Sequence, residues 1–235
     1  MKDNIEIIYE IFTPEHLEQA TKLLISCFSG RDYSGKPFPD NVFREPMCEI
    51  LSYDSVIEYM TEMNKKWSTN GLGLIAKDNQ TQEVVGVVTA EDFLDQEDIS
   101  PELNIIFNKD DFKHSALFLE DIDEPILKMN PKRGEVAHMI FFGVKLNSVY
   151  ETLKLGSSLC NNHFNLAKQK GFKYYCAECT GNASQHIFEK KFGFENKKEI
   201  NYEEWKSPIS GEFIWKKNLA SVKSNPSIKL MLKKL

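Results

Sequence analysis

The chain has 235 residues, of which 41% are hydrophobic, so it is long enough to bury the core of a single domain. Its formal net charge of −6 argues against a nucleic-acid-binding protein, and no apolar run approaches the ~20 residues of a membrane span. Five cysteines without an apolar N-terminal signal region predict a cytoplasmic protein with reduced thiols.

The first 90 residues predict a strand, two amphipathic helices and a hairpin. Thr13-Pro14-Glu15 is suited to start a helix, because proline fits the first helical turn. Apolar side chains recur at helical spacing in both helices, which predicts that one face of each lies on the core. The predicted elements are a strand at 5–12, helices at 13–28 and 55–67, and a hairpin of 71–76 with 83–90.

Residues 91–133 form a variable insertion in this arrangement. The segment mixes acidic clusters with the apolar run Ile105-Ile106-Phe107, and a helix is expected around 114–129. It is expected either to cover the sheet or to form a wall of an acceptor site.

The next segment, 134–194, predicts the order strand, turn, helix, strand, helix. Two strands joined through a helix run parallel, so the N-terminus of the connecting helix opens at the carboxyl edge of the sheet. The predicted elements are a strand at 138–144, a helix from about 154 to 171, a strand at 173–179 and a helix at 182–191.

The start of the connecting helix is a candidate phosphate site. Leu155-Gly156-Ser157-Ser158 can present backbone N–H groups to an anion, and Gly156 lets the backbone approach closely. An ordinary crossover helix with a glycine in its first turn has the same pattern, so local features alone leave both interpretations open.

The end of the chain predicts an antiparallel pair and a basic tail. Segments 194–205 and 211–217 alternate, with a turn at Ser207-Pro208-Ile209-Ser210. Residues 221–235 carry four lysines among apolar residues. This tail is expected to form a short amphipathic helix on the domain or a frayed end, with membrane contact as a further alternative.

Residues 134–194 resemble the core of the GCN5-related N-acetyltransferases, in which acyl-coenzyme A lies between two splayed parallel strands. The pyrophosphate turn of that family reads Arg or Gln, x, x, Gly, x, Gly or Ala. The matching positions here are Glu151, Lys154 and Gly156, and only Gly156 fits. The run 182–194 resembles the family's Asn-containing helix, which ends in Lys, x, Gly-Phe.

The resemblance implies an α/β fold over residues 1–220 as one domain, with a mixed, mostly antiparallel sheet, a central splayed parallel pair and flanking helices. It implies transfer of an acetyl group from acetyl-coenzyme A to a small amine by direct attack in a ternary complex, without a metal. A monomer or homodimer is expected. The alternatives are a protein or peptide N-acetyltransferase and a non-catalytic domain that binds acyl-coenzyme A.

The same resemblance places the cofactor along the first strand and the helix that follows it. Backbone N–H groups near 142–144 would meet the thioester oxygen, because splaying frees donors that a regular ladder would use. Lys154 could also pair with a phosphate. The residues expected to contact the cofactor are Phe142, Gly143, Val144, Lys154, Leu155, Gly156, Ser157, Ser158 and Asn182.

A narrower resemblance concerns Glu45. The segment Phe43-Arg44-Glu45-Pro46-Met47 resembles the Glu-Pro segment of the insect-type arylalkylamine N-acetyltransferases, where the glutamate is the general base. That subgroup also has a hydroxyl-rich run before its last core helix, which here includes Thr180 and Ser184. The resemblance thus implies Glu45 as general base, with Thr180 and Ser184 as hydroxyl partners. Without it, a glutamate before proline is usually a turn carboxylate.

The acid that protonates the leaving thiolate differs from the one that the family pattern implies. Many family members have a tyrosine on the last core helix, where this chain has Phe188. Ser184 or water is expected to replace it, with Tyr174, Tyr175 and His186 as fallback acids. A zinc or redox site at Cys176-Ala177-Glu178-Cys179 is disfavoured, because residues three apart on a strand point to opposite faces.

Overall fold

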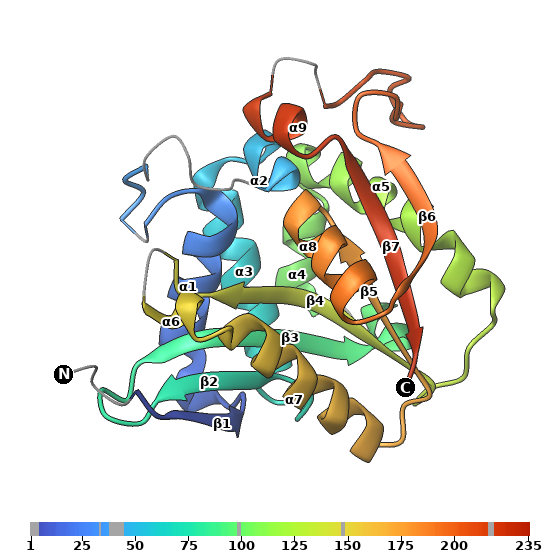
Figure 1. Cartoon of the computed structure of the whole chain (residues 1–235). Helices are drawn as coiled ribbons and strands as arrows, with labels where there is room; N and C mark the ends of the chain where they lie inside the picture. The colour runs from blue at the N-terminus through green and yellow to red at the C-terminus, as the bar shows by residue number, and fades with distance from the viewer. Residues whose placement is uncertain (1–4, 33, 38–44, 98–99, 147–148, 216–218) are drawn as a thin grey trace.

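The computed structural model describes residues 5–32, 34–37, 45–97, 100–146, 149–215 and 219–235. Within them, seven strands form one sheet in the order β1-β2-β3-β4-β5-β7-β6, with helices on both faces (Figure 1). Only β4 and β5 pair in parallel, and the other neighbours are antiparallel. The expected mixed, mostly antiparallel α/β sheet with a parallel pair is therefore confirmed.

The first third of the chain folds largely as its pattern predicts. Thr13 caps the first helical turn, where its side chain and that of His16 form a reciprocal capping box. Segments 38–44, which include part of the loop before Glu45, lie outside the described residues. The elements are β1 (Ile7–Ile11), a 3-10 turn (Pro14–His16), α1 (Leu17–Ser29), α2 (Pro46–Ile50), α3 (Tyr53–Trp67), β2 (Leu74–Asp78) and β3 (Val84–Asp92).

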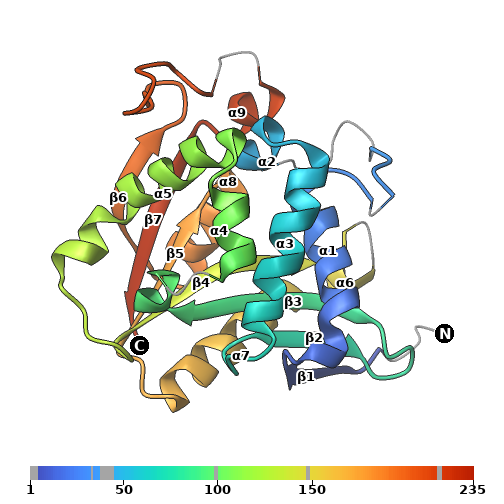
Figure 2. The same cartoon turned by 180° about the vertical axis from the view of Figure 1, so that it is seen from behind.

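The insertion contains a 3-10 turn (Phe93–Glu97), α4 (Pro101–Phe107) and α5 (Asp110–Lys128). Both helices lie with α1 and α3 on the face of the sheet opposite α7, with α4 next to α3 (Figure 2). Buried Phe118, Ile122 and Ile126 of α5 pack on the sheet in a cluster with β7. None of the described helices combines the length and the apolar composition needed to cross a membrane.

The parallel strands belong to the segment 134–194, whose expected order of elements is confirmed. The elements are β4 (Val136–Val144), a short α6 (Val149–Thr152), α7 (Leu155–Gln169), β5 (Tyr174–Cys179), and α8 (Asn182–His186), which continues into a π-helical turn (Ile187–Lys191). β4 pairs with β5 only from Val136 to Met139, although β4 continues to Val144 and β5 to Cys179. The two strands therefore diverge beyond Met139, which confirms the splay.

The turn expected at 207–210 is confirmed, because Gly211 donates to the carbonyl of Ser207 and Lys206 forms an antiparallel bridge with Phe213. The expected pairing of 194–205 with 211–217 and the expected form of the tail are wrong. β6 (Glu195–Asn201) pairs with β7 (Ser227–Lys234), and the only β-bridge described within 207–215 is an isolated one at Phe213. A short α9 (Ala220–Ser224) precedes β7, which lies between β5 and β6 instead of forming an amphipathic helix or a frayed end. The helical interpretation fails because β7 is buried on both faces.

Lysine side chains of β7 explain why this strand resembles a basic helix. Lys233 places its ammonium group 5.7 Å from the ring centroids of Phe164 and Phe194 and donates to the carbonyl of Phe192 at 2.7 Å. The alkyl stem of such a lysine can cover apolar surface while its charge reaches an acceptor. Lysines in β7 therefore do not mark a solvent-exposed helix face.

Candidate active site

A cavity of about 1040 Å³ lies where β4 and β5 diverge. Its lining includes Phe142 and Phe188, which pack on the α7 side of the sheet, and Tyr59 and Phe141, which pack on the α3 side. The cavity therefore connects the two faces of the sheet through the gap between the strands. Residues of α4 and α5 complete its wall, as expected for one of the two roles of the insertion.

The edge of β4 that faces this gap is open. Residues Phe141 to Val144 pair with β3 on one side, whereas none of the described strands pairs with them on the other. In an antiparallel ladder, alternate residues direct their N–H and C=O groups away from the partner strand. Backbone groups of this segment are thus available to a ligand in the gap.

The start of α7 lies next to this open edge. A Cβ atom at Gly156 would lie 3.0 Å from Cζ of Phe142, so the glycine allows the helix to approach β4 closely. Lys154 precedes the helix with a left-handed φ of 54°. Lys191, at the end of the π-helical turn, donates a hydrogen bond to the hydroxyl of Ser157. Two lysines thus flank the half-buried N-terminus of α7, which can receive an anion.

The other residues expected to bind the cofactor differ in their surroundings. Gly143 lies opposite Val87 of β3 and is buried against α1, where an added Cβ would lie 2.9 Å from Sγ of Cys27, so a side chain would not fit at this position. Leu155 is buried in the core beneath α7. Asn182 donates from its side chain to the carbonyl of Ser224 at 2.6 Å and ties α8 to the segment before β7.

Glu45 lies in the wall of the cavity, 3% exposed, at the N-terminus of α2. Its backbone N–H donates to Phe28 of α1, and its Oε2 accepts from the N–H of Cys48 at 2.9 Å. Burial raises the pKa of Glu45 to about 7, although hydrogen bonds from Met47, Cys48 and Thr180 oppose the shift. A carboxylate with this pKa can accept a proton near neutral pH.

Thr180 and Ser184 line the same cavity as Glu45. Thr180 contributes a hydrogen bond that lowers the pKa of Glu45, while Ser184 donates to the carbonyl of Gly181 at 2.8 Å. The structure therefore brings together the three side chains that the resemblance assigned to catalysis.

The fallback acids do not reach this place. Tyr175 is fully buried, and its hydroxyl is 2.5 Å from Nδ1 of His163 on the α7 side. Neither Tyr174 nor His186 is among the described residues that line the cavity. Tyr59 of α3 does line it, and burial followed by the charge of Glu91 raises the pKa of its phenol. The amphipathic spacing of α3 predicts only a core helix, so no sequence pattern singles out Tyr59.

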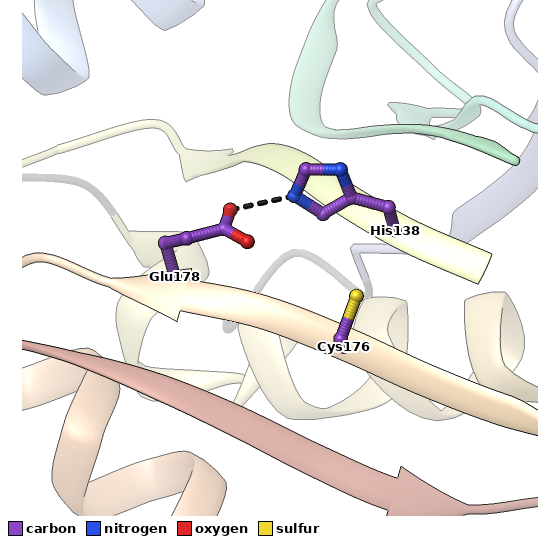
Figure 3. Close-up of side chains that lie close together, drawn as sticks. All are labelled: His138, Cys176 and Glu178. Carbon is purple, nitrogen blue, oxygen red and sulfur yellow. Dashed lines mark hydrogen bonds and ion pairs between the residues drawn. The ribbon is translucent and has the colours of Figure 1, made fainter. Parts of the chain in front are cut away.

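A second polar group lies where β4 and β5 begin to diverge. Figure 3 shows Glu178 of β5 pointing toward His138 of β4, with Nε2 and Oε2 2.6 Å apart. Burial lowers the pKa of His138, but the charge and hydrogen bond of Glu178 outweigh it and raise the pKa. Conversely, His138 outweighs burial and lowers the pKa of Glu178. His138 and Glu178 both line the cavity.

Cys176 lies beside this pair, directly across from His138 in the strand register. The donor atoms of His138, Cys176 and Glu178 all lie within 4.8 Å of one another, so these residues could hold a metal ion. However, His138 and Glu178 already form a hydrogen-bonded pair, and burial raises the pKa of the Cys176 thiol. A thiol binds a metal as its thiolate, so this arrangement favours a polar pair over a metal centre.

The pairing of His138 with Glu178 could not be predicted from the sequence, because 138–144 and 173–179 have the pattern of core strands and the sequence motif that includes Cys176 joins it only to Cys179. The signal was present as a histidine and a glutamate inside apolar runs. It could be interpreted only once the register placed His138 beside Cys176 and Glu178 on one face of the sheet.

A stability measurement can test the burial of Glu45. Its pKa is about 7 in the folded chain against an ordinary value of 4.5. The free energy of unfolding therefore falls as pH rises from 4.5 to 7, because the charged form must be buried. Relative to wild type, Glu45→Gln should therefore gain up to about 3 kcal/mol between pH 4.5 and pH 8. Urea unfolding of both proteins at the two pH values measures this gain, and an equal difference at both would contradict the buried carboxylate.

No family model and no curated protein matches this sequence. Solved structures do match it. The C-terminal condensation domain of Ebony, solved with β-alanyl-dopamine, has a TM-score of 0.75 at 12% identity over 98% of this chain and 100% of that chain. Arylalkylamine N-acetyltransferase 2 from Aedes aegypti has a TM-score of 0.68 at 17% identity over 97% and 99%.

The polyamine N-acetyltransferase of Drosophila melanogaster, described as forming N-acetylagmatine, has a TM-score of 0.68 at 14% identity, over 98% of this chain and 100% of that chain. At these identities the similarity establishes the fold. The structural neighbours include insect arylalkylamine N-acetyltransferases and other N-acetyltransferases of the GCN5-related type, so the resemblance seen in the sequence is confirmed at the level of the fold.

Proposed function

We propose that this chain, which has the fold of the GCN5-related N-acetyltransferases, is an acyl-coenzyme A-dependent N-acyltransferase that acetylates a small amine. One observation carries the proposal: the open edge of β4 and the buried carboxylate of Glu45 belong to the same cavity. An acyl thioester bound along that edge and an amine near Glu45 would meet inside the protein, away from bulk water.

The residues along β4 and α7 fit an acyl-coenzyme A arm. Phe142 to Val144 would hydrogen-bond the pantetheine amides as an added strand does. The N-terminus of α7, with Lys154 and Lys191 beside it, would take the pyrophosphate. Asn182, whose side chain bonds Ser224, would act indirectly by holding α8 in place.

Glu45 would act as the general base. An alkylamine has a pKa near 10, so it arrives as an ammonium ion and must lose a proton before its nitrogen can attack. Glu45 takes that proton, the nitrogen lone pair forms a C–N bond with the thioester carbon, and the C–S bond breaks with its electron pair on sulfur. The nitrogen of the adduct loses a second proton, which passes through water or the Ser184 hydroxyl to the thiolate, and Glu45 releases the first proton to solvent.

The thiolate does not need a strong acid. A thiol has a pKa near 8.5, so a proton from water or from the Ser184 hydroxyl is sufficient once the C–S bond has broken. The reaction can therefore proceed with Phe188, which has no proton to donate, at the position where many family members have a tyrosine. Backbone N–H groups near Phe142 would stabilise the oxyanion meanwhile.

A thiol-release screen with acetyl-coenzyme A tests the function directly. The acceptors should include arylalkylamines, alkylamines, polyamines and peptides, with product identified by mass spectrometry. We expect turnover on at least one small amine. Turnover on peptides alone would favour a peptide N-acetyltransferase. Calorimetric binding of acetyl-coenzyme A without any turnover would favour a non-catalytic binding domain. If no binding is detected at millimolar ligand, both the enzyme and the binding domain are refuted.

A further inference from the structure

Two buried carboxylates in the cavity each have one oxygen engaged by the protein and one oxygen without a hydrogen-bond partner. Glu45 Oε2 accepts from Cys48, and Glu178 Oε2 contacts His138. Among the described residues, Glu45 Oε1 and Glu178 Oε1 have no hydrogen-bond partner. The side chain of Glu178 is 9% exposed, and Glu45 is 3% exposed. Burying such an oxygen without a donor costs free energy, so both oxygens are suited to a ligand that brings donors.

The charge of the lining points to a cationic ligand. Among its described residues are five carboxylates, Glu45, Glu91, Glu120, Asp123 and Glu178, against two cationic side chains, Lys66 and His138. Lys66 already pairs with Glu91 at 2.7 Å. Ser115 of α5 lines the same cavity, and its buried Oγ atom has no hydrogen-bond partner in the described part of the chain.

Thr180, which follows β5, links the positions of the two carboxylates. Glu178 and Thr180 are two residues apart and both line the cavity, and Thr180 hydrogen-bonds to Glu45. Two residues of extended chain span about 7 Å, which sets the scale of the distance between the two anionic positions. Aromatic side chains line the same cavity, with the rings of Tyr59 and Phe112 5.2 Å apart and those of Tyr59 and Phe141 6.1 Å apart.

We propose that the acceptor is a short aliphatic diamine. Its attacking nitrogen lies at Glu45 and its second ammonium group lies at Glu178, with Ser115 as a further acceptor. This inference rests on the N-acyltransferase function proposed above. The aromatic walls would cover the methylene chain, and about four to six methylene groups match the spacing of the carboxylates. Acylation removes one of the two positive charges, so the monoacylated product would bind less tightly than the diamine.

The test compares two acceptors of equal length, 1,5-diaminopentane and pentylamine, with acetyl-coenzyme A as donor. Only the first brings a second ammonium group to Glu178. Because this group is bound before and during the reaction, its loss should appear mainly in KM. We expect kcat/KM to be at least about 10-fold higher for the diamine, the size of one charge-assisted hydrogen bond.

Glu178→Gln is the diagnostic variant, because the amide can still accept a hydrogen bond from His138 while its negative charge is removed. We expect the diamine-to-monoamine ratio of kcat/KM to fall to near one in this variant and to fall by a smaller factor in Ser115→Ala. Glu189→Gln, which removes a surface carboxylate paired with Lys190, is the matched control and should keep the wild-type ratio.

The outcomes separate this inference from the function on which it rests. If no amine is acetylated, the proposed function fails. If amines are acetylated but the wild-type protein treats the two acceptors alike, only the diamine inference fails, and this comparison needs no variant to fold. If the purified wild-type protein contains stoichiometric zinc and Glu178→Gln does not, His138, Cys176 and Glu178 would instead be assigned to a metal site. If the wild-type protein prefers a β-alanyl thioester to acetyl-coenzyme A and Glu178→Gln loses this preference, Glu178 would instead bind the acyl group of the donor.

Discussion

Glu45→Gln should lower kcat for amine acetylation by about 10²–10⁴-fold, the usual contribution of a general base. The glutamine amide keeps the size of the side chain and can still accept from the N–H of Cys48, but it cannot take a proton from the ammonium ion. Steady-state thiol release measures kcat, and calorimetry measures acetyl-coenzyme A affinity, which should change far less. Glu62→Gln on α3, which removes a carboxylate paired with Lys65, is the control.

The pH profile gives an independent check of the same prediction. Because the pKa of Glu45 is raised to about 7, kcat/KM of the wild-type protein should fall as pH drops through 7 and the carboxylate becomes protonated. The variant should lack this inflection. A variant with the wild-type rate, or with the same inflection, would remove Glu45 as the base and direct attention to His138.

Removal of residues 226–235 should prevent the chain from folding. β7 pairs with β5 on one side and with β6 on the other, and Ile228, Leu230 and Met231 are fully buried. Loss of a buried leucine-sized side chain alone costs about 2–5 kcal/mol, so the loss of several exceeds the 5–15 kcal/mol by which a typical domain is stable. Circular dichroism and urea unfolding of the truncated chain measure the effect.

A control for the truncation lies in segment 211–217. Its alternation predicts a strand, but its described residues, 211–215, form only an isolated bridge. Phe213→Ser changes a side chain that is 48% exposed and should alter the free energy of unfolding by no more than about 0.5 kcal/mol. A truncated chain that still unfolds cooperatively, or a large loss of stability in Phe213→Ser, would contradict the assignment of β7 to the interior of the sheet.

The local hydrophobic pattern predicted two kinds of element: helices that bury one face, and strands and helices whose order along the chain determines how they pack. The amphipathic spacing of α1 and α3 and the strand-helix-strand order around α7 are examples. It could not predict β7, because the mixture of lysine and apolar residues in that strand has two explanations. The burial of both its faces depends on β5 and β6, which are distant in the sequence.

The candidate site was predictable to a smaller extent. The resemblance, and not the residue pattern, singled out Glu45, and the burial that raises its pKa arises from helices far along the chain. Asn182 illustrates the opposite case: its motif suggested a cofactor contact, but its side chain holds the backbone of Ser224. His138 and Glu178 came together only through the register of β4 on β5.

The position of β7 also sets the order of events during synthesis. β7 follows β5 and β6 in the sequence but is an inner strand of the sheet, and it closes against β5 with the N–H of Leu235 bonded to the carbonyl of Lys173. Until β7 is synthesised, β5 lacks a partner along one edge and β6 has no partner among the described strands, and such edges are prone to aggregate. The sheet can therefore close only after residues 227–234 have been synthesised, and the edges of β5 and β6 stay open to other chains until then.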